Sequence, residues 1–259
     1  MRLGLVADAE VLSFSPLYFR RIYALPYETY VPRELGEIRK GIQERHWTGF
    51  NVTTPFKEKI VPLLDELSPV AEAIQAVNTV VISPDGRWKG HNTDYQAALY
   101  LLGEFANIYL PWQAVFILGT GGAARAVALA HKELFPNLPI FFITRSLQRD
   151  KLAFPHSYHL LSYEECPNYT FPERPMIVQA TPAGMFPHVL SLPPFPISRI
   201  QKGWIVWDLI YNPSPTYFLQ LSYKQGASIE TGFLFFRKQA ECSLQLWTET
   251  WCTIHSKTD

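Results

Sequence analysis

Three features of the sequence predict an α/β fold of two domains. Short apolar runs alternate with helical patterns through roughly the first hundred residues, which is typical of an α/β layer with mainly parallel strands. A second unit begins near Pro111, where a buried-strand pattern leads into a glycine-rich turn and then a helix. The chain has 259 residues, of which 47% are hydrophobic, and this is enough for one large domain or two modest ones.

Strands and helices alternate along the first unit. Ser15 is predicted to cap a helix that carries Pro16 at its first position. Pro84-Asp85-Gly86 is a hairpin-type turn signal between two strands. The predicted strands of this unit are 3–6, 27–31, 48–52, 76–83 and 87–90, and its predicted helices are 16–23, 32–45 and 93–102.

The second unit repeats a strand-and-helix pattern around its glycine-rich turn. A helix is predicted from that turn to about Leu134, and one long helix over 232–253 ends the chain. The segment 187–197 contains four prolines and is predicted to be a surface loop. The predicted strands of this unit are 113–118, 139–144, 158–161, 175–179 and 205–209.

The composition argues against several classes of protein. Lys+Arg and Asp+Glu both number 23, and this balance disfavours a general nucleic-acid binder. No segment offers roughly 20 uninterrupted apolar residues, so we expect no membrane span, and the first residues do not resemble a signal peptide. The three cysteines form neither a CxxC pair nor a cluster with histidines. We therefore expect no disulfide framework and no metal site, and a cytoplasmic, reducing location.

The turn GTGGAARA (119–126) lies between a predicted strand and a predicted helix. Gly119, Gly121 and Gly122, with Ala124 in the last place, come close to the GxGxxG/A pattern. Glycines let the backbone turn tightly and approach a pyrophosphate, which the N–H groups of the helix N-terminus then bind. A plain strand-to-helix link is the alternative, but the strand-turn-helix context favours dinucleotide binding.

The end of the next predicted strand indicates which dinucleotide is bound. NAD enzymes of this type usually carry Asp or Glu there, to accept from the ribose 2′-hydroxyl. This chain has Thr144-Arg145-Ser146, followed by Arg149. Guanidinium groups make charge-assisted hydrogen bonds with a 2′-phosphate, so the sequence favours NADP. The alternative is that both arginines are solvated surface residues.

Four polar stretches lie at or near the ends of predicted strands, where open α/β sheets bind ligands. They are SFSP (13–16), NVTTPFK (51–57), AVNT (76–79) and GHNTD (90–94). Their Ser, Thr and Asn side chains could bind a polyhydroxylated or carboxylated small molecule, namely Ser13, Ser15, Thr53, Asn78 and Asn92. Lys57 and Asp94 could hold and move a proton. Alternatively, Ser15 and Asp94 are helix caps and Lys57 is a solvated lysine.

Together these blocks resemble the shikimate/quinate dehydrogenase family over nearly the whole chain. The substrate-domain motifs appear as SxSP, NVTxPxK, the Asn-Thr of AVNT and the NTD of GHNTD. The remaining blocks are GTGGAARA, TRSLQR (144–149), ATPAGM (180–185), DLIYNPSPT (208–216) and GFLFFRKQA (232–240). The chain departs from the family pattern at Gln179, where Asn is usual, and at Phe235-Phe236-Arg237, where Met-Leu-Val is more typical.

The resemblance implies a discontinuous substrate-binding domain, residues 1–102 with 231–259, and a Rossmann-type NADP-binding domain over 103–230. It also implies NADPH-dependent, reversible reduction of 3-dehydroshikimate to shikimate, a step toward chorismate and the aromatic amino acids. Lys57 and Asp94 would be the catalytic pair. The implied substrate contacts are Ser13, Ser15, Thr53, Asn78, Tyr211 and Gln239. The implied cofactor contacts are Gly119, Thr120, Gly121, Gly122, Ala123, Thr144, Arg145, Ser146, Arg149, Thr181, Leu209 and Gly232.

The residues agree with this chemistry. Reducing a ketone requires a proton for the developing alkoxide, and a nearby ammonium group supplies both that proton and positive charge. An unperturbed lysine is protonated at neutral pH, which suits the reductive direction. The sequence leaves open which of Lys57 and Asp94 is the formal acid.

The sequence leaves four further questions open. The chain could prefer quinate and NAD, or it could be a non-catalytic, NADP-responsive binding protein on the same fold. It could act as a monomer or a homodimer. It could also be a stand-alone enzyme or part of a fused polypeptide.

Overall fold

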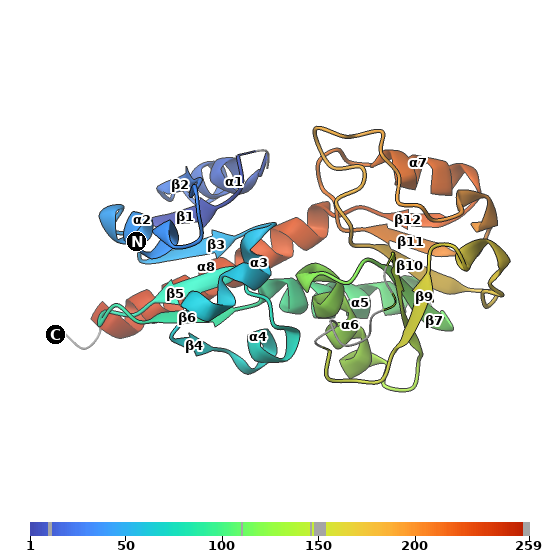
Figure 1. Cartoon of the computed structure of the whole chain (residues 1–259), viewed down its shortest axis with the longest axis horizontal. Helices are drawn as coiled ribbons and strands as arrows, with labels where there is room; N and C mark the ends of the chain where they lie inside the picture. The colour runs from blue at the N-terminus through green and yellow to red at the C-terminus, as the bar shows by residue number, and fades with distance from the viewer. Residues whose placement is uncertain (10–11, 110, 146, 148–153, 256–259) are drawn as a thin grey trace. The chain divides into compact units, whose positions relative to one another are not determined.

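The computed structural model describes residues 1–9, 12–109, 111–145, 147 and 154–255. The chain divides into two compact units (Figure 1). Unit 1 comprises Met1–Thr93 and Gln239–Asp259, and unit 2 comprises Asp94–Lys238. Each unit contains one six-stranded sheet with helices, so the predicted α/β fold is confirmed.

The sheet of unit 1 has the strand order β2-β1-β3-β5-β6-β4. The pairs β1–β2, β1–β3 and β4–β6 are parallel, whereas β3–β5 and β5–β6 are antiparallel. The antiparallel pair β5–β6 is the hairpin that Pro84-Asp85-Gly86 predicts. The strands are β1 (Leu3–Val6), β2 (Tyr27–Tyr30), β3 (Gly49–Val52), β4 (Glu66–Leu67), β5 (Thr79–Ile82) and β6 (Trp88–His91).

Short helices connect these strands, and one long helix completes unit 1. Helix α8 (Phe233–His255) runs along the sheet in Figure 1. Its Ala240 and Trp247 belong to one buried hydrophobic cluster with Leu3 and Leu5 of β1. The Trp247 indole N–H also donates to the Val80 carbonyl at 2.9 Å. The other helices are α1 (Ser15–Ile22), α2 (Glu37–Glu44), α3 (Phe56–Lys59), η1 (Val61–Leu63) and α4 (Pro69–Ile74). Helix α5 (Thr93–Tyr109) begins at Thr93 and belongs to unit 2 from Asp94 onward.

The sheet of unit 2 has the order β12-β11-β10-β7-β8-β9, and every pair is parallel. This is the doubly wound order in which the first strand lies at the centre and the chain reverses direction between β7 and β10. The strands are β7 (Ala114–Leu118), β8 (Ile140–Thr144), β9 (His159–Ser162), β10 (Pro175–Gln179), β11 (Ile205–Asp208) and β12 (Ser228–Glu230). The helices are α6 (Gly122–Leu134), η3 (Cys166–Asn168), η4 (Ile197–Arg199) and α7 (Tyr217–Lys224).

Two helix starts differ from the sequence prediction. Ser15 is not the cap of α1, because Phe14 holds that position and makes no side-chain capping bond. Instead, the Ser13 hydroxyl accepts the backbone N–H of Ser15 at 3.2 Å. The helix predicted from residue 32 begins at Glu37, after a turn in which the Glu37 N–H donates to the Glu34 carbonyl.

The short helices α4 (Pro69–Ile74) and α7 (Tyr217–Lys224) were not predicted from the sequence. Both have a hydroxyl cap that the sequence displays. Ser68 accepts from Ala71 N–H at 3.3 Å at the start of α4, and Thr216 accepts from Leu219 N–H at 3.3 Å at the start of α7. Helices this short depend on tertiary packing for their stability. They also span too few residues to show a clear helical periodicity in the sequence.

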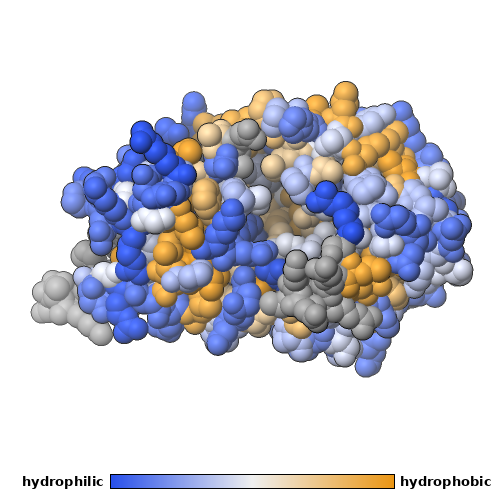
Figure 2. All heavy atoms as spheres, viewed as in Figure 1, coloured by the Kyte–Doolittle hydropathy of each residue, from blue (hydrophilic) through white to orange (hydrophobic). Residues whose placement is uncertain are grey.

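The visible face in Figure 2 carries hydrophilic and hydrophobic residues intermixed (Figure 2). Across the described ranges, none of the helices combines the length and apolar character that crossing a membrane requires. Among the same residues, no group of three or more His, Cys, Asp or Glu is placed to hold a metal ion. In the described structure, Cys166, Cys242 and Cys252 are not joined in disulfides.

Candidate functional site

The four polar stretches of unit 1 meet at one edge of its sheet. SFSP and NVTTPFK follow β1 and β3, which are parallel neighbours. Strand β6 runs in the same direction as β3, because β6 is antiparallel to β5 and β5 is antiparallel to β3. GHNTD, at the end of β6, therefore lies at the same edge. For the same reason AVNT, which precedes β5, lies at this edge and not at the opposite one.

Asn78, one of the predicted substrate contacts in unit 1, is buried and held by several hydrogen bonds. Its side chain is only 2% exposed. The amide oxygen accepts from the Thr93 N–H at 2.7 Å, and the amide nitrogen donates to the Thr93 hydroxyl at 3.0 Å. The same nitrogen lies 3.5 Å from the Gln239 amide oxygen. The fold therefore brings together Asn78 and Gln239, which are 161 positions apart in the chain.

Ser13 and Ser15 form a pair of adjacent hydroxyls at the start of α1. Their oxygens lie 3.1 Å apart, and Ser15 is 6% exposed whereas Ser13 is half-buried. Two hydroxyls at this spacing can both donate to one carboxylate group.

Thr53 and Lys57 lie on the turn between β3 and α3. The Thr53 N–H donates to the Val6 carbonyl at 3.1 Å, and the Thr53 carbonyl accepts from Phe56 N–H at 2.8 Å, which starts α3. Lys57 is half-buried, and its carbonyl accepts from Val77 N–H at 2.8 Å. These bonds connect NVTTPFK to the backbone just before Asn78.

Asp94 and Asn92 flank Thr93 at the start of α5. Asp94 is the second residue of the helix and is 2% exposed. The Asn92 amide donates to the Ala76 carbonyl at 2.9 Å, so this side chain helps to hold the AVNT stretch in place. The pairing of Lys57 with Asp94 stays a prediction.

In unit 2, the glycine-rich turn lies at the point where the strand order reverses. Gly119 has a φ of +99°, and a Cβ built on it would lie 3.0 Å from the Thr181 methyl group. Gly121 is the extended cap residue of α6, and Gly122 is the first residue of that helix, which has 13 residues. The Arg125 guanidinium donates to the Thr120 carbonyl at 2.9 Å and braces the turn. Ala123 follows in the first turn of α6.

The loops after β10 and β11 come up to the same edge. Thr181 donates both its N–H and its hydroxyl to the Gln179 amide oxygen, each at 2.9 Å. The Gln179 side chain therefore accepts the hydrogen bonds that stabilise this turn, at a position where the family usually has Asn. Gly232 approaches Leu209 so closely that a Cβ would lie 2.2 Å from the Leu209 carbonyl oxygen.

The predicted 2′-phosphate residues are only partly described. Thr144 ends β8 and is 9% exposed, and Arg145 follows it as an exposed side chain. Ser146 and Arg149 lie outside the described residues.

Tyr211 lies in the loop after β11, where a buried carboxyl group holds the backbone. The Tyr211 ring packs on Phe236, with ring centroids 4.4 Å apart. Asp208 accepts from the Ile210 N–H at 3.0 Å and from the Thr216 hydroxyl at 2.6 Å. Burial of the Asp208 carboxyl raises its pKa to about 7.

One further titratable group lies near the substrate-side edge of unit 1. His91, the last residue of β6, is half-buried, and its pKa is lowered first by burial and then by the charge of Lys89. The His91 carbonyl accepts the Asn78 N–H at 3.1 Å. A neutral imidazole is therefore favoured for His91 at neutral pH.

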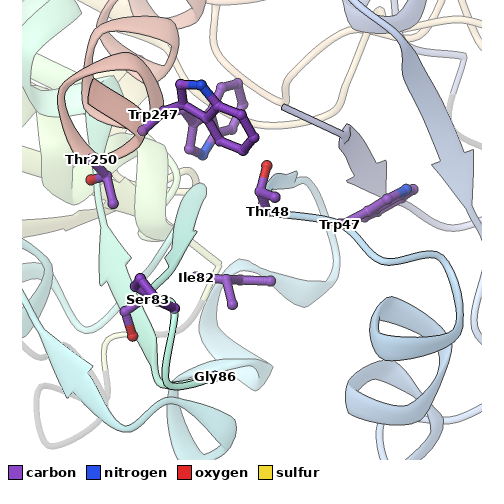
Figure 3. A pocket seen from close by; sticks show the side chains of 9 residues that line it. Trp47, Thr48, Ile82, Ser83, Gly86, Trp247 and Thr250 are labelled. Atoms are coloured by element: carbon purple, nitrogen blue, oxygen red, sulfur yellow. The ribbon is translucent and has the colours of Figure 1, made fainter. Parts of the chain in front are cut away.

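Figure 3 shows a separate pocket of about 410 Å³ within unit 1 (Figure 3). Its walls include Trp47, Ile82 and Trp247. Thr48 precedes β3 and Ile82 ends β5, so the pocket lies at the opposite edge of the sheet from Asn78. The residues that line it include none of the predicted site residues.

Three buried hydroxyl groups contact Asn78 or its neighbours and were not predicted from the sequence. They belong to Thr79, Thr93 and Ser243, and each is wholly buried. Ser243 could have been found from the sequence, because it follows Gln239 by four positions and so lies on the same face of α8.

The parallel sheet with its glycine turn at the reversal point defines unit 2 as a dinucleotide-binding α/β unit of Rossmann type. Residues 11–80 match the family described as the shikimate dehydrogenase substrate binding domain. The NADP(+)-dependent shikimate dehydrogenase of Desulforamulus reducens is 34% identical over 232 residues, which cover 84% of this chain and 77% of that protein. That of Bacillus cereus is 38% identical over 222 residues, covering 83% and 78%. The chain belongs to the shikimate dehydrogenase family.

Solved structures agree with the sequence relatives. Shikimate dehydrogenase 1 from Peptoclostridium difficile has a TM-score of 0.80 at 31% identity, covering 96% of this chain and 92% of that chain. The Thermus thermophilus enzyme, in complex with NADP(H) and shikimate, has a TM-score of 0.78 at 28% identity, covering 96% and 94%.

Proposed function

We propose that this chain catalyses the NADPH-dependent, reversible reduction of 3-dehydroshikimate to shikimate. The observation that carries the proposal is its 34–38% identity to NADP-dependent shikimate dehydrogenases over 83–84% of the chain. The retained motifs occupy the strand edges described above, where α/β proteins bind small molecules.

The substrate side of the proposal uses the polar edge of unit 1. Ser13 and Ser15, with oxygens 3.1 Å apart, are assigned to the substrate carboxylate. The Asn78 and Gln239 amides are assigned to the ring hydroxyls, since an amide can both donate to and accept from a hydroxyl group. Thr53 and Tyr211 are the remaining assigned contacts.

The residues of unit 2 fit NADP. The left-handed Gly119 and the extended Gly121 open a tight turn onto the N-terminus of α6, whose free N–H groups suit a pyrophosphate. Arg145, at the end of β8, is assigned to the 2′-phosphate. Thr144 and Thr181 add hydroxyl groups to the same edge of the sheet.

NADPH, when bound, supplies a hydride to the ketone carbon. The electron pair of the carbonyl bond then moves to oxygen, and the Lys57 ammonium donates the proton that this oxygen takes up. Asp94 is assigned to orient that ammonium and to share its proton. A positioned acid of this kind contributes roughly 10²–10⁴-fold to the rate.

An absorbance assay of the reduced cofactor tests the proposal, crossing shikimate and quinate with NADP and NAD. The highest kcat/KM is expected for shikimate with NADP. Turnover confined to quinate with NAD would reassign the substrate and cofactor. Binding of NADP and shikimate without turnover would identify a binding protein instead.

Replacing Lys57 tests the proton-transfer role. Lys57→Ala is expected to lower kcat by roughly 10²–10⁴ while shikimate still binds. Lys59→Ala is the matched control, because Lys59 is an exposed lysine of the same four-residue helix. A Lys57→Ala enzyme with the kcat of the Lys59→Ala enzyme would show that Lys57 is not the acid.

We further propose that the enzyme acts in the cytoplasm as a monomer or homodimer. Its three cysteines are not joined in disulfides in the described structure, which suits a reducing compartment. Light scattering of the purified protein distinguishes the two assembly states.

A further inference from the structure

A hydrogen-bond network lies beneath the substrate edge of unit 1, with Ser243 of α8 at its centre. The Ser243 hydroxyl oxygen is 2.8 Å from the Thr79 hydroxyl, 3.1 Å from the Thr93 hydroxyl and 3.0 Å from the Asn51 amide nitrogen. It also lies 2.9 Å from the Gln239 carbonyl, one helical turn earlier. Ser243 is wholly buried.

The donors and acceptors of this network have a defined direction. The Asn51 amide nitrogen donates to the Asn78 backbone carbonyl at 3.0 Å, and because a carbonyl only accepts, this end of the amide is the nitrogen that lies 3.0 Å from Ser243. The buried Tyr27 hydroxyl donates to the Asn51 amide oxygen at 2.7 Å. The second Asn51 N–H has two acceptors, the Ser243 and Thr79 hydroxyls, each 3.0 Å from the nitrogen. The Ser243 proton goes either to the Gln239 carbonyl or to one of the threonine hydroxyls. Without this oxygen, the Asn51 N–H and the threonine hydroxyls lose a partner inside the protein.

Two threonines connect Ser243 to Asn78. The Thr79 and Thr93 hydroxyls each lie 3.2 Å from the Asn78 amide oxygen. The same hydroxyls are the ones that contact Ser243. Ser243 also bonds the backbone of Gln239, whose side chain meets the Asn78 nitrogen. One buried hydroxyl thus supports both amides that are assigned to the ring hydroxyls.

We propose that Ser243 is a positioning residue for substrate binding. It holds Thr79 and Thr93 so that the Asn78 amide presents its nitrogen and oxygen in one fixed orientation. Ser243 is buried and acts through these neighbours and not by touching the substrate. This inference rests on the proposed function, because it concerns the binding of shikimate at Asn78 and Gln239.

The test compares Ser243→Ala with Ser222→Ala. Ser222 is a matched control because it is also wholly buried in a helix and donates to the carbonyl four positions earlier, at 2.8 Å, but it lies in α7 of unit 2. Ser243→Ala is expected to raise the KM for shikimate roughly tenfold, the scale of one lost buried hydrogen bond. Its KM for NADP should stay within about twofold of the wild-type value.

A merely structural role for Ser243 predicts a different result. Both alanine variants would then unfold at lower temperature, and the KM for shikimate would not change selectively. An unchanged KM for shikimate in Ser243→Ala overturns the proposal, and so does an equal rise in the KM for NADP.

The side-chain amide signals of Asn78 and Asn51 in nitrogen-15 NMR spectra supply a readout that needs no activity. In the ligand-free protein, Ser243→Ala should shift these signals and speed their hydrogen exchange, whereas Ser222→Ala should not. Unchanged amide signals overturn the positioning role itself. If the wild-type protein fails to turn over shikimate while these signals move, the network stands and the substrate assignment falls.

Discussion

Replacing Asp208 by Asn should change how the stability of the protein depends on pH. Asp208 is wholly buried at the end of β11, and burial raises its pKa from 3.8 to about 7. A carboxyl group whose pKa is raised on folding binds its proton more tightly in the folded state. Its contribution to stability is therefore fully present below pH 3.8 and is lost as the pH rises through about 7.

The magnitude follows from the two pKa values. The difference of about 3 units corresponds to roughly 4 kcal/mol, of which about 3 kcal/mol falls between pH 5 and 8. Asp208→Asn stays neutral throughout this range and keeps a partner for the Thr216 hydroxyl. Relative to the wild type, the free energy of unfolding of Asp208→Asn should therefore rise by about 3 kcal/mol from pH 5 to 8.

Urea unfolding at pH 5, 6, 7 and 8 measures the difference in free energy of unfolding between Asp208→Asn and the wild type. Titratable groups that both proteins share contribute equally to the two values and cancel in the difference. Asp85→Asn is the matched control, because Asp85 is exposed and its pKa is lowered by the Ser83 hydroxyl, so it titrates below this range. If the wild-type and Asp208→Asn curves run parallel from pH 5 to 8, Asp208 does not carry a raised pKa and the reasoning from burial fails.

Two further predictions concern unit 2. Gly232→Ala should lower the free energy of unfolding by about 2 kcal/mol, because the new Cβ meets the Leu209 carbonyl. Gly103→Ala is the control and should not destabilise the protein, because nothing lies within 4 Å of its Cβ. Equal urea midpoints for the two variants would contradict the close approach at Gly232. Arg145→Gln should raise the KM for NADP about tenfold and leave that for NAD nearly unchanged. An equal rise for both cofactors in steady-state kinetics would exclude a 2′-phosphate contact.

The doubly wound sheet of unit 2 was the part of the fold most readable from the sequence. Its parallel strands are buried on both faces, so they appear as continuous apolar runs bounded by turn residues. Strand β10 has the predicted bounds of 175–179, and β7 and β8 begin one residue later than predicted. The tiny strands β4 and β12 were missed, because two or three residues carry no periodic signal.

Sequence motifs predicted the site residues, whereas the structure shows which other residues contact them. Ser13 and Ser15 are neighbours in sequence, so their adjacency was readable, although the capping role of Ser15 was wrong. The contact between Asn78 and Gln239 depends on α8 returning to the first sheet. No local pattern predicts such a return.

By itself, the sequence determined the α/β class, the glycine turn after β7 and the polar residues at the strand ends, because each depends on neighbours within a few positions of the chain. Only the tertiary structure decided that Asn51, Thr79, Thr93 and Ser243 share one buried network, since up to 192 positions separate its members. Buried polar groups must find partners wherever the chain brings them. Those partners are set by the packing of α8 on the sheet.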